Sequence, residues 1–180
     1  MRIDVDTPRL RLRELTIDDA DFVVAQLNDP DFIRNVADRG VRTAEAARKY
    51  IEDGPVASYR RHGFGLWLVE LKPSRAPIGI CGLIKRDTLD DVDLGYAFLP
   101  PFRSQGFALE AATATMTRAR ELGLRRVVAI VSPGNAASIR LLGKLAFGRE
   151  RTVRLGADAE ELELYASAPA TGPPRQGGEQ

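Results

Sequence analysis

Apolar and charged residues alternate most regularly near the start of the chain. In the segment PRLRLRE (8–14), arginines separate Leu10 from Leu12, which is the period-two pattern of a strand with one buried face. Further apolar runs bounded by turn residues predict strands at 64–71, 78–85, 126–131, 147–155 and 161–166, with a turn at 156–158 between the last two. Another strand ends near Leu99, because Pro100 and Pro101 cannot donate to a neighbouring strand.

Helical patterns fill the gaps between these runs. Thr16 and Asp19 form a capping pair that predicts a first helix, and Thr43 begins a second one that Gly54-Pro55 interrupts before it resumes through Tyr59.

Two further helices are predicted in the second half of the chain. One begins near Gly106 and repeats apolar residues along one face, and the other is capped by Asn135 and reaches about Leu145. Hairpins come first and crossover helices later. This order predicts an α/β (α+β) fold with a mixed, mainly antiparallel sheet and helices on both faces.

Composition favours one globular domain. The chain has 180 residues, 44% of them hydrophobic, so we expect a single domain over 1–167. Residues 168–180 are polar and rich in Pro and Gly, which predicts a disordered tail. The net charge of +1 argues against nucleic acid or an anionic membrane as the main partner.

The expected location is the cytoplasm. No apolar run approaches the roughly 20 residues that cross a bilayer. The start of the chain carries charges where a secretory signal would need an apolar stretch. The single cysteine, Cys81, agrees, since it allows no internal disulfide.

Several kinds of chemistry lose support from the residues that the chain lacks. With one His and one Cys, a structural zinc site is nearly excluded, and we expect no metal. A Cys–His pair or a Ser–His–Asp triad would need His62, which is more typical of a surface histidine. Cys81 lies in an apolar run, as a buried thiol does. Neither a P-loop nor a dinucleotide fingerprint is present, which argues against NTPases and Rossmann dehydrogenases.

The segment 91–124 is the most informative part of the chain. A strand ends at Pro100-Pro101, the pattern Arg103-x-x-Gly106-x-Ala108 follows, and a long helix begins. The first turn of a helix has unpaired N–H groups and partial positive charge, so a pyrophosphate fits there. Gly106 and Ala108 keep the backbone accessible, and Arg103 can add a fixed charge.

This segment resembles motif A of the GNAT acetyltransferase superfamily. Asp93-Leu94-Gly95-Tyr96 stands at the family's "E-I-G-Y" position and Leu109-Glu110-Ala111 at its "T-E-A" position. The resemblance covers 7–166, and the opening TPRLRLRELTIDDAD is similar to the Rim-type ribosomal-protein N-terminal acetyltransferase branch. It implies the GNAT acyl-CoA N-acyltransferase fold, with acetyl-CoA as co-substrate.

The resemblance also implies where the cofactor binds. Its pyrophosphate would meet the side chain of Arg103 and the backbone N–H groups of Ser104, Gln105, Gly106, Phe107, Ala108 and Leu109. An oxyanion donor is expected among main-chain N–H groups near the end of the strand at 96–99, and Leu99 at that end is counted among the cofactor-binding residues.

The stretch 132–147 resembles motif B of the family. Asn135 would contact the pantetheine of CoA, or only cap its helix, or do both. Ser138 stands where the ribosomal-protein branch has a serine proposed to protonate the departing thiolate, although it is equally typical of an ordinary helix position. Many family members have a Tyr where this chain has Leu142. Ala146 replaces the family's usual Gly, so we expect a somewhat different turn there.

Two residues are candidates for the general base. Asp93 shares a strand face with Gly95 and Ala97, and Glu161 precedes Tyr165 at the acidic position of the family's "D-x-x-L-Y" ending. Either could accept a proton if burial raises its pKa towards neutrality. An ordinary charge on an exposed strand is the alternative for both.

The sequence therefore predicts an acetyl-CoA-dependent N-acetyltransferase that transfers acetyl to a primary amine by direct attack, without an acyl-enzyme. The acceptor could be a protein N-terminal α-amine, which the Rim-type resemblance favours, or an amino acid, a polyamine or an aminoglycoside. Alternatives are a non-catalytic acyl-CoA-binding or sensing module and, more weakly, nucleic-acid binding through Arg125-Arg126 and Arg149-Arg151. A homodimer is compatible with the sequence, which identifies neither the acceptor nor the preferred acyl length.

Overall fold

The computed structural model describes residues 4–157 and 159–168. The strands are β1 (Asp4–Asp6), β2 (Leu10–Glu14), β3 (Leu66–Leu71), β4 (Pro77–Ile84), β5 (Val92–Phe98), β6 (Val127–Val131), β7 (Phe147–Val153) and β8 (Leu162–Ser167). The helices are α1 (Ala20–Leu27), α2 (Pro30–Asn35), α3 (Ala44–Ile51), α4 (Ala57–His62), α5 (Phe107–Glu121) and α6 (Ala136–Lys144). Short turns of helix are η1 (Ile17–Asp19), η2 (Glu52–Val56) and η3 (Pro100–Phe102).

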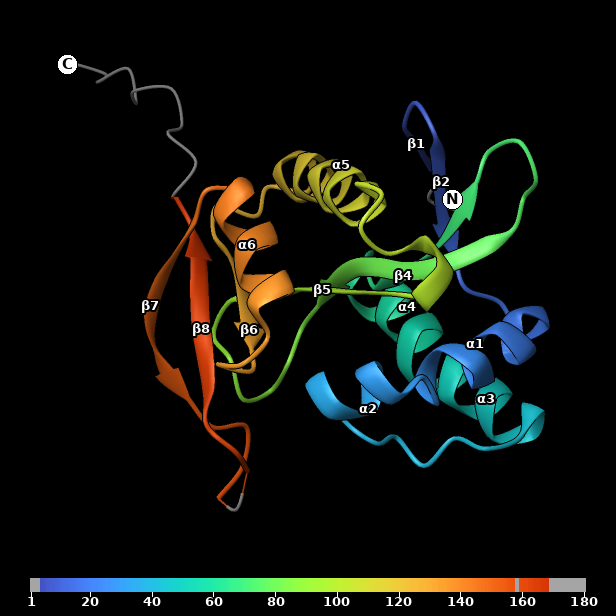
Figure 1. Ribbon diagram of the computed structural model, residues 1–180, viewed down its shortest axis with the longest axis horizontal. Coiled ribbons are helices and arrows are strands. Elements are labelled where there is room, and N and C mark those ends of the chain that lie inside the picture. The colour runs from blue at the N-terminus through green and yellow to red at the C-terminus, as the bar shows by residue number, and fades with distance from the viewer. Residues whose placement is uncertain (1–3, 158, 169–180) are drawn as a thin grey trace, which may run out of the picture.

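The strands of the described residues form one sheet in the order β1-β2-β3-β4-β5-β6-β8-β7. Neighbours are antiparallel except β5 and β6, which are parallel and pair only at Val92↔Val127 and Asp93↔Val128. Beyond Asp93, β5 stays paired with β4 as far as Phe98, while β6 stays paired with β8. The sheet therefore opens between β5 and β6 (Figure 1).

Helices cover both faces of this sheet. On one face α5 packs on β2, β4 and β5, and α6 packs on β6 and β7 (Figure 1). On the other face α1 and α3 pack together over Leu68 and Ile80. The predicted mixed, mainly antiparallel sheet with helices on both faces is confirmed.

Local sequence signals account for most element boundaries. The backbone N–H of Thr16 donates to Asp19 (2.8 Å) at the start of the first helical segment, and Asn135 accepts from the backbone N–H of Ser138 (3.1 Å) at the start of α6. Gly54-Pro55 lies in a π-helical turn that joins α3 to α4, so the predicted interruption is a wide turn of helix.

Two elements were not predicted: β1, and α2 with its Asp29 cap and Pro30 at the first helical position. Of the predicted disordered tail, residues 169–180 lie outside the described residues, as does Asp158 in the predicted 156–158 turn.

The prediction of a different turn at Ala146 is wrong. Ala146 adopts φ of 59°, and its N–H donates to the carbonyl of Gly143 (3.0 Å), so the left-handed turn is kept without glycine. An L-residue in this conformation costs about 1–2 kcal/mol, and glycine would avoid that cost. Part of the gain is lost, because glycine gives the unfolded chain more conformational freedom.

Ala146→Gly should therefore raise the free energy of unfolding by about 0.5 kcal/mol and the Tm by roughly 1–2 °C. Thermal unfolding measures this, and an unchanged or lowered Tm would contradict the proposed strain.

Candidate active site

A cleft of about 690 Å³ occupies the opening between β5 and β6. On the side of α5 and α6, called the α6 side below, its lining includes Gly106, Ala108, Leu109, Asn135 and Ser138. On the side of α1 and α3, called the α3 side, its lining includes Val36, Arg39, Tyr50, Arg86 and Asp93. The volume suits a small molecule, and the cleft connects the two faces of the sheet.

The loop before α5 presents its backbone to the cleft. Gly106 has φ of +81° and precedes the first helical residue, Phe107. The first helical hydrogen bond runs from the N–H of Glu110 to the carbonyl of Gly106 (3.0 Å), so the N–H groups of 107–109 precede it and are left free by the helix. With Gly106 carrying no side chain, these donors fit a pyrophosphate.

The structure brings most but not all of the predicted loop residues to the cleft. Ser104, Gly106, Ala108 and Leu109 line it. The side chain of Gln105 instead donates to the carbonyl of Pro101 (2.7 Å), and the ring of Phe107 is buried in the core. Any contact of these two residues with a phosphate would be through their backbone alone.

A network of ion pairs and hydrogen bonds holds this loop, formed by residues outside the cleft lining. The carboxylate of Glu110 accepts from the hydroxyl of Thr7 (2.6 Å) and from Nε of Arg9 (2.6 Å). Arg9 also donates to the carbonyl of Gln105 (3.1 Å) and stacks over Phe107 at 4.4 Å. Arg9 was missed in the sequence because it lies about a hundred residues from the loop, although Glu110 in the first helical turn was a signal for a partner.

Arg103 does not present a free charge to the cleft, which corrects the sequence prediction. Its Nε donates to the carbonyl of Phe98 (2.8 Å), and its guanidinium pairs with Asp31 (2.5 Å) and with Asp29. Arg103 thus fastens the start of α2 to the end of β5. The prediction failed because α2, which supplies these carboxylates, was not expected.

Leu99, predicted to bind the cofactor, does not offer a free backbone N–H and is not part of the cleft lining, which is a second correction. Its N–H donates to the carbonyl of Ile78 in the edge shared with β4 (2.9 Å). Because N–H groups alternate sides along a strand, that of Phe98 faces the opening towards β6. Phe98 also lines the cleft, so its N–H is a candidate for the predicted oxyanion donor.

Asn135 and Ser138 meet at the α6 side of the cleft. Asn135 uses Oδ1 to cap α6, and its Nδ2 has no hydrogen-bond acceptor among the described residues, so capping does not preclude a contact with a ligand. The hydroxyl of Ser138 lies 2.6 Å from that of Tyr96 on β5. Leu142, where many family members have Tyr, is fully buried in the core.

Tyr96 is a functional candidate that was not predicted from the sequence. Burial raises the pKa of Tyr96 to about 12 although its hydrogen bond with Ser138 opposes the shift, so the phenol keeps its proton at neutral pH. Strand alternation was a usable signal, since it places Tyr96 on the face of Leu94 and Phe98, opposite to that of Asp93.

The structure separates the two candidate bases. Asp93 lines the cleft with only 1% of its surface exposed, and Nε of Arg86 donates to its Oδ2 (2.7 Å). Burial raises the pKa of Asp93 to about 6 against the opposing charge of Arg86. Its Oδ1 makes no hydrogen bond to the described residues. Glu161, by contrast, is exposed, pairs with Arg154 (2.8 Å) and is not part of the cleft lining.

This arrangement agrees with comparisons to known proteins. A family model described as an acetyltransferase (GNAT) domain matches residues 9–148. The chain belongs to the GNAT acetyltransferase family. As a member, it is an acetyl-CoA-dependent N-acetyltransferase.

Relatives of this GNAT acetyltransferase match most of its length. The uncharacterized protein YkkB of Bacillus subtilis is 28% identical over 154 residues, covering 82% of this chain and 87% of that protein. The uncharacterized N-acetyltransferase YoaA of the same organism is 28% identical over 152 residues, covering 83% and 85%.

Among solved structures, RimL, the ribosomal L7/L12 alpha-N-protein acetyltransferase, is described in complex with coenzyme A. It superposes with a TM-score of 0.78 at 19% identity, covering 91% of this chain and 97% of that one. At that identity the likeness shows the fold. In the described part of this GNAT acetyltransferase, no helix is both long enough and apolar enough to cross a membrane.

Proposed function

We propose that this protein transfers the acetyl group of acetyl-CoA to a primary amine by direct attack within the cleft. The observation that carries the proposal is the cleft itself. It crosses the sheet where β5 and β6 part, with free helix N–H groups on its α6 side and the buried carboxylate of Asp93 on its α3 side.

Each step of the proposed transfer has a residue at the cleft. The N–H groups of the loop before α5 bind the pyrophosphate, and Asn135 meets the pantetheine. The N–H of Phe98 stabilises the charge that develops on the thioester oxygen as the amine attacks its carbon. Asp93 accepts a proton from the amine, the C–S bond breaks, and Ser138 donates a proton to the departing thiolate.

Direct transfer is supported by the state of the chain's cysteine. Cys81 is fully buried in the core, and burial raises the pKa of its thiol to about 12. A thiol in this state is a poor nucleophile. Neither Cys81 nor His62 lines the cleft, so the chemistry of a covalent Cys–His pair has no support there.

The alternative of a non-catalytic acyl-CoA-binding module has less support. Such a module needs the loop before α5, but it needs neither a buried carboxylate with a raised pKa nor the Ser138–Tyr96 hydroxyl pair. A protein N-terminal α-amine stays a candidate acceptor, supported by the Rim-type resemblance of the opening segment and by the fold likeness to RimL.

A screen for acetylated products tests the proposal. The protein is incubated with acetyl-CoA and a panel of ribosomal-protein peptides, amino acids, polyamines and aminoglycosides, and mass spectrometry follows product and released CoA. Acetylated amine with stoichiometric CoA supports the enzyme. Tight CoA binding with no product from any amine would favour the sensing module instead.

Ser138→Ala should lower kcat at least tenfold while the Kd for CoA stays within about twofold, because the thiolate then leaves without its proton donor. An acyl donor whose thiol is more acidic should recover much of the rate. Thr113→Ala removes an exposed hydroxyl bonded within α5 and serves as the control. An undiminished rate in Ser138→Ala would remove it as the acid.

A further inference from the structure

The α3 side of the cleft contains an arginine without a counter-ion. Arg39 lines the cleft, and no carboxylate of the described residues lies within ion-pair distance of it. Its neighbours in the chain differ, since Arg34 pairs with Asp31 (2.9 Å) and Arg42 with Asp38 (2.7 Å). Within the described part of the chain, the guanidinium of Arg39 is therefore unpaired at the cleft wall.

The acidic residues of the cleft lining pair with arginines other than Arg39. Asp29 and Asp31 are held by Arg103, and Asp93 is held by Arg86. The remaining cations of the lining, Arg140 and Lys144, belong to α6 and to the other side. On the α3 side, then, three described arginines face three described aspartates, and Arg39 is the arginine left without a carboxylate, because Arg103 holds two of them.

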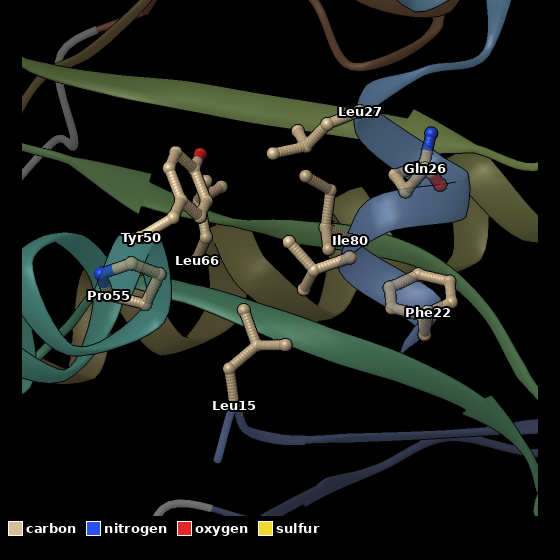
Figure 2. A pocket seen from close by; sticks show the side chains of 9 residues that line it. Leu15, Phe22, Gln26, Leu27, Tyr50, Pro55, Leu66 and Ile80 are labelled. Atoms are coloured by element: carbon tan, nitrogen blue, oxygen red, sulfur yellow. The ribbon is translucent and has the colours of Figure 1, made fainter. Parts of the chain in front are cut away.

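Tyr50 lines the same side of the cleft as Arg39 and Arg86. Burial raises the pKa of Tyr50, while the charges of Arg39 and Arg86 act on it in the opposite direction. The hydroxyl has no hydrogen-bond partner among the described residues. Figure 2 shows the ring of Tyr50 beside Leu66, with its hydroxyl pointing away from Pro55.

The ring of Tyr50 is held by its surroundings. Tyr50, Leu66 and Ile80 line both the cleft and a small apolar cavity of about 10 Å³ behind it, which has room for about one water-sized probe. Close packing on that scale limits the movement of the ring, so the phenol can act as a hydrogen-bond donor on the α3 side of the cleft.

From these residues we infer that the acceptor amine carries an anionic group, a carboxylate or a phosphate, which pairs with Arg39 and accepts a hydrogen bond from Tyr50. Arg39 suits such a group because its guanidinium presents two parallel donors. The amine of the same molecule then faces Asp93. This inference rests on the proposed function and argues against polyamines and aminoglycosides, whose extra positive charges would meet Arg39.

Matched acceptors test the inference by kcat/KM. An amine with a free carboxylate is compared with its methyl ester, a phosphorylated amine with its dephosphorylated form, and both with spermidine. We expect the anionic member of at least one pair to be preferred tenfold or more, and the pair that shows the preference distinguishes carboxylate from phosphate.

Arg39→Gln should abolish that preference by raising the KM for the anionic acceptor about tenfold with little change in kcat, and Arg39→Lys should restore part of it. Arg42→Gln, which removes a nearby arginine outside the cleft lining, should keep the preference. A preference that survives Arg39→Gln, or spermidine as the best acceptor, would overturn the inference alone. No product from any amine would overturn the proposed function as well.

Discussion

Gly106→Val should weaken CoA binding more than tenfold. Gly106 has φ of +81°, where a β-branched residue is strongly disfavoured, so the loop must change its backbone to accept valine. That change turns away the N–H groups of 107–109 that would bind the pyrophosphate. A tenfold loss corresponds to about 1.4 kcal/mol of binding free energy, which a single lost charge-assisted hydrogen bond can account for. Isothermal titration calorimetry with CoA measures it.

Gly123→Val is a control matched in backbone conformation, although a Cβ at Gly106 would also come within 3.3 Å of the Arg9 guanidinium. Gly123 has φ of +78° at the far end of α5, and an added Cβ would meet nothing within 4 Å. Both variants should lose similar stability from backbone strain, whereas only Gly106→Val should lose affinity. Equal CoA affinity in the two variants would contradict the proposed binding loop.

Asp93→Asn should lower kcat/KM about 100-fold. It should also remove the acidic limb of the pH–rate profile, in which the rate falls near pH 6. Because burial raises the pKa of Asp93 to about 6, the carboxylate is ionised above that pH and can accept a proton. As the pH falls through 6 it becomes protonated, so the rate of the wild-type protein should fall. Asparagine cannot titrate, and the profile of the variant should lack this limb. Steady-state kinetics from pH 5 to pH 8 measure both effects.

Two controls separate catalysis from folding in this experiment. Glu161→Gln removes the other predicted base, which is exposed and paired with Arg154, and should leave both rate and profile unchanged. CoA affinity and thermal unfolding of Asp93→Asn check that Arg86, now without its charge partner, has not disturbed the α6 side. A normal rate with the limb intact would exclude Asp93 as the base.

Local sequence signals predicted the parts of the site that depend on a few neighbouring residues. Gly106 was expected to open the loop before α5, and its positive φ is the conformation that glycine adopts without cost. Asn135 was expected to cap the next helix, and its side chain accepts from the N–H of Ser138. Such interactions close within three or four residues, so they are encoded where they occur.

The roles that were misassigned depend on distant partners. Whether Arg103 is free depended on Asp29 and Asp31, some seventy residues earlier in the chain. Whether the backbone N–H of Leu99 was free depended on whether it points towards β4, and its hydrogen bond to the carbonyl of Ile78 shows that it does.

By itself the sequence determined the fold class, the order of most of the elements and the place where the loop before α5 meets its helix, since these follow from periodicity, caps and turn residues. Only the tertiary structure decided which ionisable groups are buried and which are paired. It placed Asp93 in the cleft and Glu161 on the surface, and it left Arg39 without a counter-ion among the described residues. The physical reason is that burial and charge pairing depend on where the sheet opens between β5 and β6, and that opening is made by strands far apart in the chain.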